Sequence, residues 1–230
     1  MITYFTKFLF ILLISLPFLG KSQKKPSIRW EPGISITKKL DSRWSYNFSL
    51  SGRQRFTNFG EGEKNLKTDR WEVKSFGTYT LFGSKKLSLG YMYRTVDPFE
   101  PESGWEHRIT QQFAFITNFG GFRLGNKFRI EQRIRSTNYL TRLRYAISND
   151  FPLQGESLDP KEFYLIGGNE LVYAFNVLGD ELENRFSLGI GRLIQGGQKI
   201  QFSVVSINSD LISSNRDHII QFESVYYFSL

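Results

Sequence analysis

Apolar and polar residues alternate with a period of two through most of the chain after residue 43. Such a period places apolar side chains on one face of a β-strand and polar side chains on the other. The longest run covers residues 122–135, where Phe128, Ile130 and Ile134 alternate with charged residues. No segment carries an apolar stripe with the 3.6-residue period of a helix, so the pattern predicts an all-β protein.

Turn residues divide the alternating runs. Gly83-Ser84, Gly120-Gly121 and Gly196-Gly197 predict short hairpin turns. Longer polar connections are expected at 58–67, 97–104, 150–160 and 208–215. The runs themselves span about 10–14 residues. Strands of soluble proteins usually have about 5–6 residues, whereas a tilted strand that crosses a membrane needs about 9–11.

The alternation predicts strands but does not fix their number. Ten strands are predicted from Ser42 onward, and residues 28–38 are a candidate for one more. Single-chain bacterial barrels have an even number of strands, with both termini on the periplasmic side. We therefore expect ten strands, with residues 28–38 outside the wall, or twelve, with one strand not yet recognised. The first count is slightly favoured.

Alternation alone also fits a soluble lipocalin-like barrel, which is apolar inside and polar outside. Aromatic residues make up 16% of the chain, with 22 Phe and 11 Tyr but only 2 Met, as expected for aromatic girdles at both membrane interfaces. The chain ends on the alternating residues Tyr226, Phe228 and Leu230. Outer-membrane barrels typically end in this way, usually on Phe, because the barrel assembly machinery reads the last strand. Strand length, composition and chain end together predict a single antiparallel transmembrane β-barrel of about 10–12 strands with up-and-down topology.

Residues 1–22 predict a cleaved signal peptide. Lys7 precedes an apolar segment, 8–19, that is shorter than the roughly 20 residues of a spanning helix. Gly20 and Ser22 are suitably small for cleavage before Gln23, which leaves 23–230 as the barrel. The protein has no cysteine, which excludes disulfides and thiolate chemistry and suits export through an oxidising periplasm. The expected location is the bacterial outer membrane.

Three stretches resemble domain of unknown function 2490, a family of uncharacterised bacterial outer-membrane proteins. They are residues 126–153 (NKFRIEQRIRSTNYLTRLRYAISNDFPL), 167–175 (GGNELVYAF) and 183–191 (ENRFSLGIG). The matching features are an Arg-Xaa-Glu-Gln-Arg strand, an Arg-Leu-Arg-Tyr strand ending in Pro-Leu, an Asn-Glu pair and an Asn-Arg-Xaa-Xaa-Xaa-Gly-Xaa-Gly strand. The chain departs from the family at Arg192, where the family usually has Tyr, and its first hundred residues match only in general character. The resemblance implies an outer-membrane barrel and no particular activity.

The alternation and the resemblance converge on one group of charged residues. If the apolar residues of these strands face lipid, the charged residues between them face the lumen. The predicted lumen cluster consists of Arg129, Glu131, Arg133, Arg135, Arg142, Arg144, Glu170, Glu183 and Arg185. Its Arg–Glu pairs could brace and plug the barrel. Alternatively, the excess of arginine could form a constriction that prefers anions. The bracing role is the favoured one.

The sequence offers little support for catalysis. His107 and His218 fall on the lipid-facing side near the outer rim, a place suited to lipid hydrolysis, but no Gly-Xaa-Ser-Xaa-Gly motif accompanies them. Two lone histidines give no metal site, and the acidic loop with Asp97, Glu100 and Glu102 is expected to be solvated rather than cation-binding. We expect no cofactor and no catalytic residue, and take the histidines as interfacial.

The partners expected from export are outer-membrane lipids, lipopolysaccharide and the assembly machinery, while nucleic acid is not expected. The predicted function is that of a structural protein or a narrow pore with an Arg-lined lumen for small anionic solutes. The alternatives are a lipid-modifying hydrolase and an accessory subunit of a larger complex, for which the connection at 58–67 would be the contact.

Overall fold

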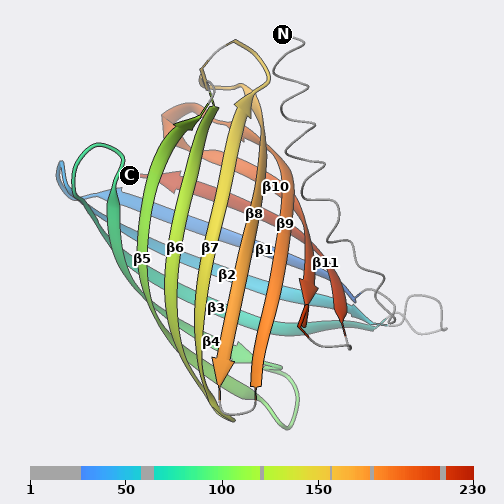
Figure 1. The fold of residues 1–230 in the computed structure, drawn as a ribbon. Helices are drawn as coiled ribbons and strands as arrows, with labels where there is room; N and C mark the ends of the chain where they lie inside the picture. The colour runs from blue at the N-terminus through green and yellow to red at the C-terminus, as the bar shows by residue number, and fades with distance from the viewer. Residues whose placement is uncertain (1–26, 58–64, 120–121, 156, 177–178, 213–215) are drawn as a thin grey trace.

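The computed structural model describes residues 27–57, 65–119, 122–155, 157–176, 179–212 and 216–230, and these form eleven strands and one short 3-10 helix (Figure 1). The strands are β1 (Ser27–Lys39), β2 (Trp44–Thr57), β3 (Asn65–Thr80), β4 (Lys86–Val96), β5 (Gly104–Phe119), β6 (Phe122–Arg135), β7 (Tyr139–Pro152), β8 (Phe163–Asn176), β9 (Gly179–Leu193), β10 (Lys199–Ser209) and β11 (Asp217–Ser229), with η2 (Gln195–Gly197) before β10. The predicted signal peptide, 1–22, lies outside the described residues. No helix in the described part of the chain is long and apolar enough to span a membrane.

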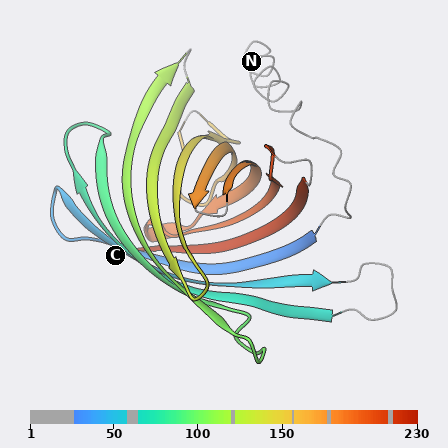
Figure 2. The same ribbon diagram turned by 60° about the horizontal axis from the view of Figure 1, so that its bottom comes forward.

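The strands form one closed barrel, in which each strand pairs antiparallel with the next (Figure 2). The predicted single β-barrel of about 10–12 strands is therefore confirmed. The expected even number is wrong, because residues 28–38 lie within the wall as β1. β1 pairs with β11 in parallel, from Ser27 opposite Ile219 to Thr37 opposite Ser229. The seam must be parallel, because the first and last of an odd number of alternating strands run in the same direction.

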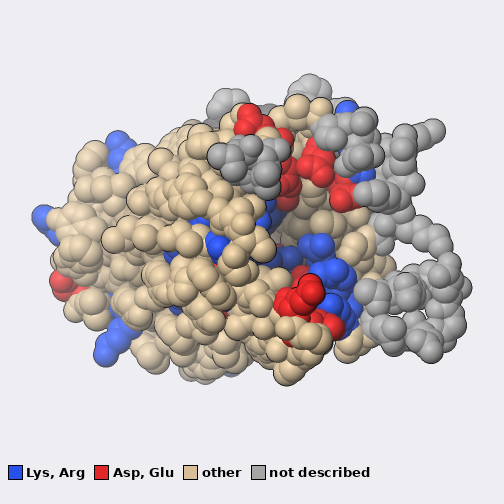
Figure 3. Space-filling model, turned by 90° about the horizontal axis from the view of Figure 1, so that it is seen from below, with Lys and Arg blue, Asp and Glu red and all other residues tan. Residues whose placement is uncertain are grey.

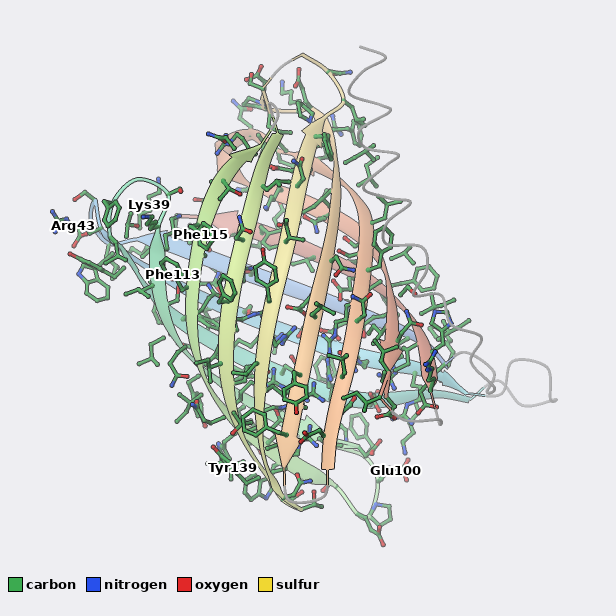
Figure 4. The ribbon with its side chains drawn as sticks, viewed as in Figure 1. Lys39, Arg43, Glu100, Phe113, Phe115 and Tyr139 are labelled. Carbon is green, nitrogen blue, oxygen red and sulfur yellow. The ribbon has the colours of Figure 1, made fainter. Side chains whose placement is uncertain are left out.

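Because the number of strands is odd, the start of β1 and the end of β11 lie at opposite rims of the barrel. We call the end at which β11 finishes the C-terminal rim and the end at which β1 begins the N-terminal rim. Figure 4 places Lys39 and Arg43 near the C-terminal rim and Glu100 and Tyr139 near the N-terminal rim. The expectation that both termini share one rim therefore fails for the described chain, since β1 starts at the rim opposite to Leu230. The Leu230 N–H donates to the carbonyl of Thr37, 2.8 Å away, and ties the chain end to β1.

The outer wall is apolar, with aromatic side chains toward both rims. Its middle carries aliphatic residues such as Ile130, which is 44% exposed. Neighbouring strands bring aromatic rings together, as in the stacked pair Phe128 and Tyr145, whose centroids lie 4.5 Å apart. Outward aromatic residues near the C-terminal rim include Trp44, Tyr79, Phe115, Tyr226 and Phe228, and those near the N-terminal rim include Tyr93, Trp105, Tyr139, Tyr173 and Phe175.

Candidate functional site

Charged side chains occupy the inward positions of the strands, because they alternate with the outward apolar residues. Figure 3 shows Lys, Arg, Asp and Glu gathered in a hollow at one end of the barrel, while the outer wall consists mostly of other residues. All nine residues of the predicted lumen cluster lie on inward positions of β6, β7, β8 and β9, where they form ion pairs with one another or with further charged residues.

Glu106, on β5, is the most heavily bonded carboxylate of the interior. It is 1% exposed. Its Oε1 accepts from Arg108 Nη2 at 2.7 Å and Arg133 Nε at 2.8 Å, and its Oε2 accepts from Arg133 Nη2 at 2.7 Å. Arg94 Nη1 and Arg135 Nε each donate to Oε2 at 3.2 Å. One carboxylate therefore holds four guanidinium groups from β4, β5 and β6.

A second group of ion pairs continues around β6, β7, β8 and β9. Arg144 joins two carboxylates, with Nη1 2.7 Å from Glu131 and Nη2 2.5 Å from Glu170. Arg129 also bonds Glu170, and Arg185 lies 3.9 Å from it. Arg185 bonds Glu183 on the same strand, and Arg142 lies 3.5 Å from Glu181. Bidentate and charge-assisted contacts of this kind fix the side chains that make them.

A third group closes the network on the side of β1, β2, β3 and β4. Glu31 accepts from Arg53 at 2.8 Å and from Arg70 at 2.9 Å. Glu72 pairs with Arg70, Arg94 and Lys74 at 2.6, 2.6 and 2.7 Å. The sequence prediction did not include these residues, nor Glu106 and Arg108. The signal was present, because Glu72 lies between Trp71 and Val73 and thus has the parity of an inward residue.

Two cavities remain inside the barrel beside this network. The central one has a volume of about 640 Å³, and its lining includes eleven arginines, two lysines and five glutamates. The other has a volume of about 510 Å³ and reaches toward the C-terminal rim. Both are lined by Lys127, Arg129, Arg144 and Arg185, together with Ile207, Gln221 and Glu223. We call the four basic residues, which lie on β6, β7 and β9, the shared basic cluster.

Several donors of the interior remain available. The Nε atoms of Arg29, Arg129, Arg142 and Arg144 are buried and have no hydrogen-bond partner in the described part of the chain. Lys127 makes no ion pair within 4.0 Å with a described residue, although it lies between two cavities. A buried donor without a partner costs about 1–3 kcal/mol unless something else accepts its hydrogen. Water or a bound anion can satisfy these groups.

Space for the central cavity comes from small side chains opposite the arginines. Gly33 and Ser35 of β1, with Ser49 and Ser51 of β2, line it. Gly33 and Ser51 are cross-strand partners, and a Cβ at Gly33 would lie only 3.1 Å from the Ser51 Cβ. These small residues of β1 and β2 therefore leave space among the charged side chains that line the rest of the cavity.

Both histidines face outward near the N-terminal rim, but their surroundings differ. The Nδ1 of His107 lies 2.6 Å from the hydroxyl of Tyr91, and its ring packs at 5.2 Å from Tyr93 and 5.0 Å from Trp105. His218 instead hydrogen-bonds a serine, with Nε2 3.0 Å from Ser206 Oγ. His107 is thus part of an aromatic cluster, whereas the partner of His218 is a serine hydroxyl.

The carboxylates of the acidic loop after β4 pair with a lysine of β3. Lys67 Nζ lies 3.2 Å from both Asp97 and Glu100. Among the residues that the structure describes, no group of three or more His, Asp and Glu could hold a metal ion.

Two of the three stretches used for the family resemblance, 167–175 and 183–191, meet across β8 and β9. Glu170 is the cross-strand partner of Arg185 on the inner face. On the outer face, Asn169 and Asn184 exchange hydrogen bonds between their side-chain amides at 3.1 and 3.2 Å. The sequence pairs Asn169-Glu170 and Asn184-Arg185 therefore contact each other on both faces of the wall, through the amides outside and through the charged groups inside.

Comparison with known proteins agrees with this resemblance. No curated protein and no solved structure matches the chain. A protein-family model described as "Protein of unknown function (DUF2490)" matches residues 32–217, from β1 to the start of β11. The chain belongs to the DUF2490 family.

Proposed function

We propose that the protein is exported by its signal peptide, 1–22, and forms a barrel in the bacterial outer membrane, inserted by the barrel assembly machinery. The apolar outer wall and the charged interior support this location, since a soluble barrel has the reverse arrangement. Trp105 and Phe115 lie ten residues apart on β5. At about 3.3 Å per residue and a tilt of about 40°, they are separated by roughly 25 Å along the barrel axis, the height of the apolar band of such barrels.

We further propose that the lumen is a narrow path for small anionic solutes, braced by the Arg–Glu network. The observation that carries this proposal is the shared basic cluster, because Lys127, Arg129, Arg144 and Arg185 line both cavities and so lie beside a solute that passes between them. Fixed basic groups in a narrow pore attract anions and repel cations. Arg129 and Arg144 are also ion-paired, but each keeps an Nε donor without a partner among the described residues, and Lys127 makes no ion pair with them. These groups are left to bind a solute, whereas the residues around Glu106 hold the wall.

Single-channel recording from the purified barrel in planar lipid bilayers, under a salt gradient, tests the proposal. We expect small steps with an anion-selective reversal potential. Lys127→Gln should weaken the selectivity, because Lys127 is free of ion pairs with described residues and its replacement disturbs no brace. Lys85→Gln, in the exposed turn before β4, is the matched control and should change little. Folded protein without conductance would mean that the network closes the lumen, and cation selectivity would refute the anion path.

A further inference from the structure

A group of polar side chains interrupts the apolar outer wall near the N-terminal rim. Ser206 and Asn208 lie on β10 and His218 lies on β11, with Asn208 and His218 directly opposite each other in the register. Asn184 of β9 is the partner of Asn208 on the other side. The next outward residues along the same strands, such as Leu188, Val204 and Phe222, are apolar, and Val204 is 45% exposed. Asn184 and Asn208 are buried, at 4% and 7% exposed, whereas Ser206 and His218 are half-buried. A partly exposed polar pair on a lipid-facing wall is costly, so Ser206 and His218 are the candidates for a function.

Ser206 and His218 have the geometry of a nucleophile and its general base. The Ser206 Oγ and the His218 Nε2 are 3.0 Å apart, which is within hydrogen-bonding reach. A serine hydroxyl becomes an effective nucleophile when a histidine at this distance can take its proton. The two residues meet because His218 is opposite Asn208 in the register, and Ser206 projects from the same face of β10 two residues away.

We propose that Ser206 and His218 form the catalytic pair of a hydrolase that cleaves carboxylic esters of membrane lipids. Ser206 Oγ attacks the ester carbonyl while its proton passes to His218 Nε2, and His218 returns that proton to the leaving alcohol oxygen. Water then attacks the acyl-serine, gives its proton to His218 and releases the fatty acid and the free hydroxyl of Ser206. The role of oxyanion donor is assigned to the side-chain amide of Asn208, the cross-strand partner of His218.

The position of the pair fits a lipid ester. The Asn208–His218 step is the next to last of the β10–β11 ladder, before Ser209 and Asp217, so the pair lies close to the rim. Lipid headgroups and ester carbonyls lie at this level when the barrel spans a bilayer. The acyl chains would run along the outer wall past Val204 and Phe222, which is 44% exposed. The inference therefore depends on the proposed membrane location but not on the lumen.

His107 provides an internal comparison. It faces outward near the same rim, but its ring is held by Tyr91, Tyr93 and Trp105, and its hydrogen bond is to a phenol. A phenol is not activated as an acyl-transfer nucleophile in this setting, and the ring is fixed by packing. His107→Ala therefore removes an interfacial histidine without touching the proposed pair.

The test uses protein isolated from the membrane fraction of cells that express the full chain, shown to be folded by heat-modifiable gel mobility. A fluorophosphonate probe, which attaches only to activated serines, is expected to label Ser206, as located by mass spectrometry. Ser206→Ala should abolish labelling, and His218→Ala should slow it by about 100-fold or more, the usual contribution of a general base. His107→Ala and Ser224→Ala, which replaces an outward serine bonded to Trp30, should label like the wild type.

The same proteins are then incubated with vesicles of phosphatidylethanolamine and phosphatidylglycerol, and released fatty acid is measured. We expect release by the wild type and none by Ser206→Ala. If the folded protein is not labelled at Ser206, the assignment of Ser206 as the nucleophile is refuted. Labelling without fatty-acid release would overturn the assignment of phospholipid esters as substrates. Neither result bears on conductance, so failure here is distinguishable from failure of the proposed pore.

Discussion

Glu106→Gln is the substitution that most directly tests the interior network. Glutamine has the shape of glutamate, but it replaces one carboxylate oxygen by an amino group that cannot accept a hydrogen bond. Each oxygen of Glu106 accepts three N–H bonds, those at Oε1 coming from Arg108 and Arg133 and those at Oε2 from Arg94, Arg133 and Arg135. The substitution therefore removes three hydrogen bonds and the charge that balances four guanidinium groups.

The expected cost follows from burial. Removing one partner of a buried ion pair destabilises a protein by about 3–5 kcal/mol, because a charge is left without compensation. Arg94 and Arg108 keep a second carboxylate, at 2.6 Å from Glu72 and 3.4 Å from Glu131 respectively. The adjoining cavity can also admit water. We therefore expect a loss at the lower end of this range, about 3 kcal/mol in the free energy of unfolding.

Urea unfolding of the barrel in lipid vesicles, followed by tryptophan fluorescence and gel mobility, measures this loss. With a dependence of about 3 kcal/mol per molar urea, the midpoint should fall by about 1 M. Glu102→Gln, in the exposed connection after β4, is the matched control and should leave the midpoint unchanged. Equal midpoints for the two variants would refute the view that the Glu106 network stabilises the barrel.

Three further substitutions examine other parts of the wall. Gly90→Ala should cost about 1–3 kcal/mol by urea unfolding, because the new Cβ would overlap the Phe76 ring. Asn169→Ala should cost about 1–3 kcal/mol in the same assay, because it leaves the amide of Asn184, which is 4% exposed, without its reciprocal partner. Lys127→Gln should not lower the urea midpoint at all, and a loss comparable to that of Glu106→Gln would show that Lys127 has a bonding role.

The sequence by itself determined the local structure of this protein. The two-residue period predicted the strands and the parity of their side chains, because alternation is a property of each strand alone. It therefore assigned Arg129, Glu131, Arg133 and Arg144 to one face before any strand was paired. The same rule assigns Glu106 and Arg108, which flank His107, to the inner face, although both lie outside the three stretches that resemble the family.

Only the tertiary structure decided how the strands meet. The parallel seam joins Ser27 to Ile219 across nearly the whole chain, and no local pattern encodes which edge a first strand will find. The same is true of the four arginines on Glu106 and of the contact between Ser206 and His218, which require a particular register between strands. A shift of one residue would reverse the faces, and a shift of two would keep the faces but change every partner. Periodicity therefore fixes the side of the wall on which a residue lies, and pairing fixes its neighbours and hence the chemistry that it can support.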